Sequence, residues 1–221
     1  ITHPDQVVAP GDVIWVEALP AAAGNGEAAA AASDDPPRFT LRQPPEVEGA
    51  DGADTMLFNG ANAAERFEMS ANGNRLRFFR DLGNITMDTN DVETVDLEAL
   101  GGADLVTAGD LTGTDVTKLN VDLEGTLGGG SGDGQPDRVV VDGTNRNDTI
   151  AVSGDAAGVS VSGLPALVSI RHQESNDELA VNGRGGNDGI SATGLASQAI
   201  KLTVDGGADD DDRRQVDRIE R

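Results

Sequence analysis

The sequence predicts an all-β protein, a right-handed parallel β-helix or β-roll-like solenoid of short strands built from two repeats of about 83 residues. Residues 54–60 (DTMLFNG) return as residues 137–143 (DRVVVDG), and the only two lysines, Lys118 and Lys201, are also 83 residues apart. Apolar and polar residues alternate within the predicted strands, as in Ile150 and Val152 or Val159 and Val161. Gly, Asn and Asp separate these strands at nearly constant spacing. Units repeated with a fixed period usually stack.

Composition favours a thin core. Aromatic residues make up only 3% of the chain, and 29 of its 221 residues are glycine. The apolar residues are mainly small or branched, which suits stacked short strands. A β-sandwich gives the same alternation of apolar and polar residues, but the regular spacing of the turn residues favours successive coils of one superhelix over the varied loops of a sandwich.

The amino-terminal part is predicted to contribute little to the repeat. Residues 1–19 read as a short β segment, in which Val7-Val8 and residues 13–16 flank the turn signal Pro10-Gly11-Asp12. Residues 20–46 are rich in Ala and Pro without an amphipathic pattern, and are predicted to be a linker.

The two copies of the repeat are predicted to span residues 47–136 and 137–216, and residues 217–221 to begin a third copy or to fray. The two copies correspond strand for strand. The predicted strands of copy 1 are residues 55–58, 66–69, 76–79, 85–87, 95–97, 105–107 and 116–121, and those of copy 2 are 138–141, 149–152, 159–162, 167–170, 178–181, 189–192 and 200–204.

The formal net charge of −23 disfavours nucleic acid and anionic membrane surfaces as partners, because both are bound through Lys and Arg. No apolar run approaches the roughly 18 residues of a membrane span. Without cysteine, oxygen atoms are the plentiful metal ligands. Two interpretations of the acidic charge compete: specific cation sites, or a solvated acidic surface.

Acidic turns carry the predicted chemistry. Before several strands a Gly or Asn turn is followed by Asp, one variable residue and an aliphatic residue; Glu65 replaces the Asp in one case. If the strands stack, these acids stack too, and Ca²⁺ binds six to eight oxygens of carboxylates and carbonyls. Asn-Asp and Gly-Asp also simply make good turns. The candidate metal ligands are Asp54, Asp104, Asp148, Asp188, Asn147, Asn187, Gly52, Gly102 and Gly186.

Residues 183–190 (GRGGNDGI) resemble a degenerate copy of the nonapeptide of bacterial repeats-in-toxin (RTX, hemolysin-type) proteins, and residues 47–209 resemble the large bacterial calcium-binding proteins related to them. The resemblance implies Ca²⁺ bound at glycine-rich turns of a parallel β-roll, in a secreted or cell-surface protein exported unfolded and folded by extracellular calcium. The second glycine of the family motif is replaced by Ala50, Leu100, Thr144 and Arg184.

We therefore expect a calcium-ion-binding repeat module without enzymatic activity, with cell-surface glycans or other domains of the same polypeptide as further partners. A polysaccharide-active β-helix enzyme is one alternative, with residues 75–80 (RLRFFR) as its nearest cluster of basic and aromatic residues; an exposed basic strand face is the favoured explanation of that cluster. A passive adhesion or spacer module without specific calcium sites is the other. His3 and His172 match no metal-binding spacing and are expected to be surface residues.

Overall fold

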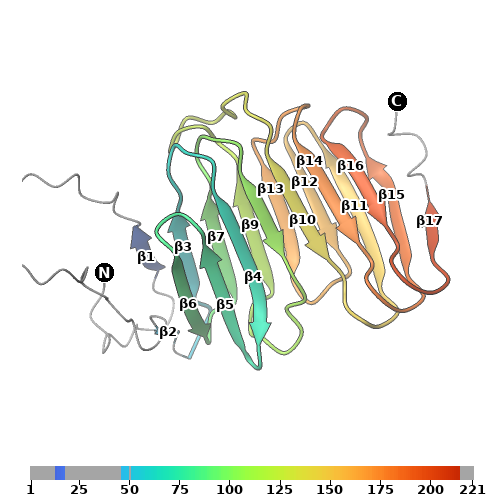
Figure 1. Ribbon diagram of the computed structural model, residues 1–221, viewed down its shortest axis with the longest axis horizontal. Coiled ribbons are helices and arrows are strands. Elements are labelled where there is room, and N and C mark those ends of the chain that lie inside the picture. Colours follow the sequence, from blue (N-terminus) through green and yellow to red (C-terminus); the bar gives the residue numbers. More distant parts are fainter. Residues whose placement is uncertain (1–12, 18–45, 50, 215–221) are drawn as a thin grey trace, which may run out of the picture.

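The computed structural model describes residues 13–17, 46–49 and 51–214, and every regular element in these ranges is a β-strand (Figure 1). The predicted strand at residues 13–16 is confirmed, as β1 (Val13–Glu17). Val7-Val8, almost all of the predicted linker and residues 217–221 lie outside the described ranges. The described part of the chain contains no helix long and apolar enough to cross a membrane.

The strands form two large sheets. Sheet A contains, in spatial order, β1, β3 (Thr55–Asn59), β7 (Thr94–Glu98), β9 (Lys118–Asp122), β13 (Leu167–Arg171), β12 (Gly158–Ser162), β11 (Thr149–Asp155), β15 (Gly189–Leu195) and β17 (Asp212–Arg214). Sheet B contains β16 (Lys201–Asp205), β14 (Glu178–Asn182), β10 (Arg138–Asp142), β8 (Leu105–Ala108), β4 (Arg66–Asn72), β5 (Arg75–Arg80), β6 (Ile85–Asn90) and β2 (Glu46–Glu48).

The two sheets share one core. Inward residues alternate with outward ones along the strands, as the period of two predicts, so that β3, for example, buries Met56 and Phe58. The largest core side chains are in copy 1, where the ring centroids of Phe58, Phe67 and Phe78 lie 4.7 to 6.2 Å apart. Copy 2 fills the corresponding positions with Val141, Ile150 and Val161, all fully buried.

Most neighbouring strands are parallel, because the chain repeatedly crosses from one sheet to the other. We call each connecting loop a corner; the corners into sheet B lie at one end of the strands and those into sheet A at the other (Figure 1). Two antiparallel meanders, β4-β5-β6 and β11-β12-β13, interrupt the predicted parallel arrangement. A turn as short as Gly73-Asn74 can only reverse the chain within its own sheet.

The predicted correspondence between copies is confirmed: β3, β4, β7, β8 and β9 of copy 1 match β10, β11, β14, β15 and β16 of copy 2. Each matched strand, however, lies in the opposite sheet. Copy 1 visits the sheets in the order A, B, A, B, A, so copy 2 begins in sheet B. Equivalent corners of the two copies therefore lie on opposite edges of the molecule.

Candidate cation sites

An acidic residue stands directly before many of the described strands, at the end of the corner. The β-strand conformation begins at the next residue, so each acid has a fixed place relative to the sheet. The acids in this position are Asp54, Glu65, Glu93, Asp104, Asp137, Asp148, Asp177, Asp188 and Asp211.

At the corners into sheet B, these acids form what we call the first ladder: Glu65, Asp104, Asp137 and Asp177. The backbone N–H of Glu65 donates to Asp104 Oδ1 at 2.8 Å, and that of Asp104 to Asp137 Oδ1 at 2.8 Å. The N–H of Asp137 donates in turn to Asp177 Oδ1 at 2.9 Å. Each carboxylate thus holds the corner of the neighbouring strand in place.

At the opposite edge, Asp148, Asp188 and Asp211 form the second ladder. The N–H of Asp148 donates to Asp188 Oδ1 at 2.8 Å, and that of Asp188 to Asp211 Oδ1 at 3.0 Å. A similar bond runs from the N–H of Asp54 to Glu93 Oε2 at 2.7 Å. Of the four predicted aspartates, only Asp148 and Asp188 are therefore neighbours, and the expectation that all four stack together is wrong.

Burial sets the electrostatics of the ladders. Asp104, Asp137, Asp177 and Asp188 are each at most 4% exposed. Burial, together with the charges of neighbouring acids, raises the pKa of Asp104 to about 8 and that of Asp137 to about 7. Burial likewise raises the pKa of Asp177 and of Asp188. The ladders thus favour protonation or the approach of a cation.

Three corners satisfy the second carboxylate oxygen of their acid from within the same loop. At Asp177, the N–H of Glu174, three residues earlier, donates to Oδ2 at 2.6 Å. In the other two, the bond comes from the residue four positions before the acid. The N–H of Ala61 donates to Glu65 Oε2 at 2.6 Å. The N–H of Thr144 donates to Asp148 Oδ2 at 2.7 Å, and the Thr144 hydroxyl lies 3.1 Å from Asp148 Oδ1. We call all three the closed corners.

The corners of Asp104 and Asp188 lack this bond, and we call them the open corners. Asp104 Oδ2 and Asp188 Oδ2 are buried and have no hydrogen-bond partner. The residue four positions earlier is Leu100 in one and Arg184 in the other, with φ of 68° and 78°. Both residues have the left-handed conformation that a glycine adopts readily, and their N–H groups do not reach the carboxylate.

Further acids surround each open corner. The charges of Asp137, Glu65 and Asp133 all raise the pKa of Asp104. The loop itself is held by one of them, since Gly102 N–H donates to Asp133 Oδ2 at 2.7 Å.

The open corner of copy 2 has the same surroundings. The charges of Asp148, Asp211 and Asp209 raise the pKa of Asp188. Gly186 N–H donates to Asp209 Oδ2, here at 3.2 Å. An acid from the adjacent corner thus fixes the glycine loop in both copies, and negative charge gathers around both unpartnered oxygens.

The predicted glycines lie in these loops with positive φ: Gly52 (143°), Gly102 (136°) and Gly186 (104°). A Cβ on Gly102 would lie 2.4 Å from the carbonyl carbon of Ala63, and one on Gly186 would lie 2.5 Å from that of Arg146. Successive corners are therefore in backbone contact, and only glycine fits there.

The predicted asparagines are exposed and hold adjacent corners together: Asn187 N–H donates to Asn147 Oδ1 at 2.9 Å. Sequence reasoning missed Asp177 as a site residue, although residues 176–179 (NDEL) repeat the Asn-Asp-x-aliphatic pattern. It also missed Asp137, whose preceding Pro136 hides the pattern.

Glu65 at the end of the first ladder has its own cation. Arg80 forms a buried ion pair with Glu65, and its guanidinium lies 5.7 Å from the centre of the Phe58 ring. Burial still raises the pKa of Glu65, although the Arg80 charge opposes that shift. The chain therefore supplies a positive group at one closed corner.

The basic and aromatic cluster of residues 75–80 is split between the two faces of β5. Phe78 and Arg80 point into the core, whereas Arg77 and Phe79 lie on the other face with the guanidinium 5.0 Å from the ring centre. Arg75 pairs with Glu48 and Asp88. The cluster therefore does not present all of its basic and aromatic side chains on one face of the strand.

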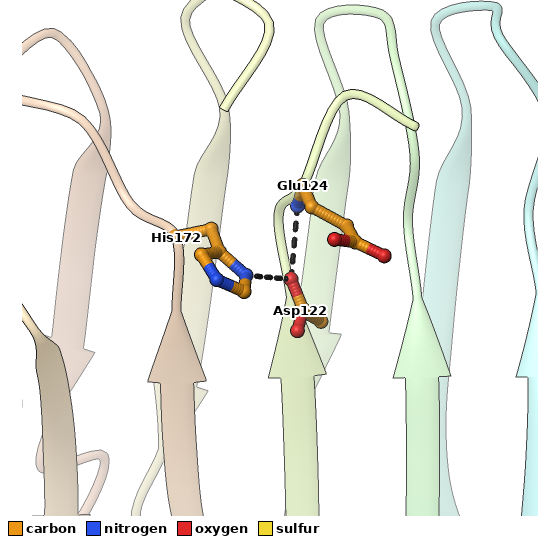
Figure 2. A group of neighbouring side chains, drawn as sticks. All are labelled: Asp122, Glu124 and His172. Atoms are coloured by element: carbon orange, nitrogen blue, oxygen red, sulfur yellow. Dashed lines mark hydrogen bonds and ion pairs between the residues drawn. The ribbon is translucent and has the colours of Figure 1, made fainter. Parts of the chain in front are cut away.

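A different group of side chains with metal-binding atoms lies where β9 and β13 end (Figure 2). His172 Nδ1 lies 2.6 Å from Asp122 Oδ1, and Glu124 N–H donates to the same oxygen at 3.0 Å. The ligating atoms of Asp122, Glu124 and His172 all lie within 4.8 Å of one another, and within the described ranges no other group of three or more acids and histidines does so. Sequence reasoning treated His172 as an isolated surface residue, because only strand pairing brings it to Asp122, 50 residues away.

No protein family model matches this chain, and no curated protein or solved structure is significantly similar to it.

Proposed function

We propose that this chain is a calcium-binding repeat module of a secreted or cell-surface protein, folded as a right-handed parallel β-helix or β-roll. The solenoid is supported by the regular alternation of the chain between two mostly parallel sheets. It is supported further by corner acids that bond to the next corner along each edge. Such a fold lets one loop design serve repeatedly as an ion site.

The observation that carries the proposal is the pair of unpartnered oxygens, Asp104 Oδ2 and Asp188 Oδ2. They occupy equivalent positions of the two copies, 84 residues apart, in the loops that contain Gly-Gly. A buried polar group without a partner costs about 1–3 kcal/mol, and more when it is charged. The surrounding carboxylates make a cation the partner that removes this cost.

Calcium suits the atoms available. Both open corners offer only oxygen: the carboxylates of the ladder, the neighbouring Asp133 or Asp209, and the loop carbonyls that Gly102 or Gly186 would supply. Ca²⁺ accepts such irregular sets of six to eight oxygens, whereas Mg²⁺ requires a near-ideal octahedron and retains water. Ca²⁺ bound there would neutralise the ladder charge.

The consequence for function is folding controlled by calcium. Without a cation the stacked carboxylates repel one another, so the compact state is disfavoured; binding of calcium to the native state alone stabilises it by mass action. A chain with this property stays extended where calcium is scarce and folds where it is abundant, as outside a cell. The module would then serve as a structural unit beside other domains.

Calorimetric melting tests the proposal. The protein is melted with excess chelator, with calcium, and with magnesium at equal ionic strength. Calcium is expected to raise the Tm well above the value in magnesium. Equal Tm values in the two salts would mean that the acids are only a screened surface, and would leave the chain as a passive spacer or adhesion module.

A further inference from the structure

The group of Asp122, Glu124 and His172 belongs to neither acid ladder, and its chemistry differs from that of the open corners because it includes an imidazole. Asp122 is the last residue of β9 and pairs in register with Arg171, the last residue of β13. His172 follows with a φ of 55° and places Nδ1 against Asp122 (Figure 2). The imidazole side chain is about one third exposed, at 32%, so an ion can reach it from solvent.

The carboxylates of this group are held in place by backbone amides. Both oxygens of Glu124 accept bonds from its own loop, Oε1 from Gly128 N–H at 2.5 Å and Oε2 from Gly130 N–H at 2.9 Å. These bonds fix the orientation of the Glu124 carboxylate. Metal-ligating carboxylates are usually oriented by second hydrogen bonds of this kind.

A third acid, Glu98, lies beside this group. Glu98, the last residue of β7, pairs in register with Asp122. Burial and the charges of Asp122 and Glu124 raise its pKa to about 7. Within the described ranges, no Lys or Arg nitrogen lies within 4.0 Å of the carboxylates of Glu98, Asp122 or Glu124. The three acids therefore form no ion pair with a Lys or Arg of the described ranges, although Arg171 is in register with Asp122.

Glu98 and Asp122 form a row across the ends of two adjacent strands, and the equivalent row in copy 2 provides a comparison. Glu98 corresponds to Asn182, which donates its amide to Asp142 Oδ1 at 2.8 Å, and Arg184 forms an ion pair with the other oxygen of Asp142. Asp122 corresponds to Asp205, which bonds to the N–H of Gly207 at 3.0 Å. Copy 2 therefore neutralises this row with its own amide and guanidinium groups. Copy 1 also has an amide in this row, since Asn59 is in register with Glu98, but it has no guanidinium there; the histidine that faces its row, His172, comes from copy 2.

We propose that Asp122, Glu124 and His172, with Glu98 beside them, form a site for a transition-metal dication, zinc foremost. Imidazole nitrogen suits Zn²⁺ and its neighbours in the first transition row, whereas Ca²⁺ selects oxygen. One nitrogen and two carboxylate oxygens match the three protein ligands of an open zinc site, with the remaining position available to water or Glu98. This site is independent of calcium at the open corners.

Isothermal titration with ZnCl₂, in a background of excess calcium, tests the site on the whole chain. The wild-type protein is expected to bind one zinc ion, and His172→Asn to lower the affinity at least about tenfold. His3→Asn, which removes the other histidine, and Asp205→Asn, the equivalent of Asp122 in copy 2, serve as controls and are expected to leave the titration unchanged. A wild-type curve retained by His172→Asn, or lost in His3→Asn, would overturn the proposal.

Nuclear magnetic resonance of the imidazole rings tests zinc binding at His172 in the wild-type protein, and so does not depend on whether His172→Asn folds. The chain contains only two histidines, and His3→Asn assigns the remaining ring signal to His172. Stoichiometric zinc is expected to shift the His172 ring nitrogens in the folded wild-type protein while calcium or magnesium leaves them in place. Unmoved His172 signals in the presence of zinc would show that no such site exists.

Discussion

The backbone N–H of Asp104 donates to Oδ1 of Asp137, which lies 33 residues later in the chain but on the adjacent strand of the same sheet. Both side chains are almost fully buried. The hydrogen bond therefore holds together two acidic residues whose carboxylates repel one another when both are ionised. The amide compensates part of one charge, and the remainder makes the first ladder sensitive to protons and cations.

The first consequence is an unusual pH dependence of the calcium-free protein. The pKa of Asp104 is raised from 3.8 to about 8, and that of Asp137 from 3.8 to about 7. Between pH 3.8 and these raised values, the two carboxyl groups bind more protons in the folded chain than in the unfolded chain. The contribution of these two carboxyl groups to the stability of the folded state is complete below about pH 4, and it is lost as the pH rises through about 7 and then 8. In chelator, we expect a Tm higher by roughly 5 °C at about pH 5.5 than at about pH 8.5. A Tm that is flat or rises over this range contradicts the buried ladder.

Substitutions at Asp137 separate its charge from its hydrogen bond. Asp137→Asn keeps an acceptor for the N–H of Asp104 and removes a charge, so at about pH 8.5 in chelator it is expected to raise the Tm. Asp137→Ala leaves that buried N–H unpaired and is expected to cost about 1–3 kcal/mol at any pH. Denaturant unfolding of both variants checks this. Equal effects of the two substitutions would mean that charge has no part in the ladder.

Glycines in the open corners are expected to tolerate no side chain. Gly102→Ala and Gly186→Ala each place a Cβ within 2.5 Å of backbone atoms in the adjacent corner, as well as forcing alanine to a positive φ. We expect a loss of about 3 kcal/mol or more in the free energy of unfolding. Gly73→Ala is the matched control, since its φ is also positive (69°) but nothing lies within 4 Å. Its loss should be only about 1–2 kcal/mol.

Arg80 and Glu65 are expected to be strongly coupled. Arg80→Met leaves Glu65 buried and negative, which is expected to cost about 3–5 kcal/mol of stability. In the double variant Glu65→Gln/Arg80→Met the uncompensated charge is absent, so it should be more stable than Arg80→Met alone. A double-mutant cycle in urea measures the difference. Additive effects of the two changes would show that the pair is not a functional unit of the fold.

Alternation of apolar and polar residues was enough to predict the strands and their match between copies, because burial on one face imposes a period of two. The two meanders could not be predicted, because the alternation of residues does not mark Gly73-Asn74 and Ala156-Ala157 as hairpin turns rather than crossings. The exchange of sheets follows from the number of strands: seven connections lead from the start of copy 1 to the start of copy 2, two of them lie within a meander, and the other five, an odd number, cross between the sheets. For the same reason Asp104 lies on the edge opposite Asp148 and Asp188, although all three share one sequence pattern.

The open corners could be located from the sequence only in part. Asp104 and Asp188 were predicted from a Gly or Asn turn followed by Asp, one variable residue and an aliphatic residue, but so were Asp54 and Asp148, whose surroundings differ. The difference between the open and the closed corners depends on the positive φ angles of Leu100 and Arg184. Residues other than glycine rarely adopt such angles, so the sequence around them did not indicate this conformation. His172 was missed because its partner Asp122 lies on a strand of the other copy.

Calcium stoichiometry tests the central claim most directly. Titration calorimetry should detect two calcium ions per chain that magnesium does not displace at equal concentration. Asp104→Asn and Asp188→Asn should each bind one, and the double variant none, while Asp54→Asn, whose corner belongs to neither ladder, should still bind two. A double variant that retains both ions would contradict the assignment of calcium to the open corners.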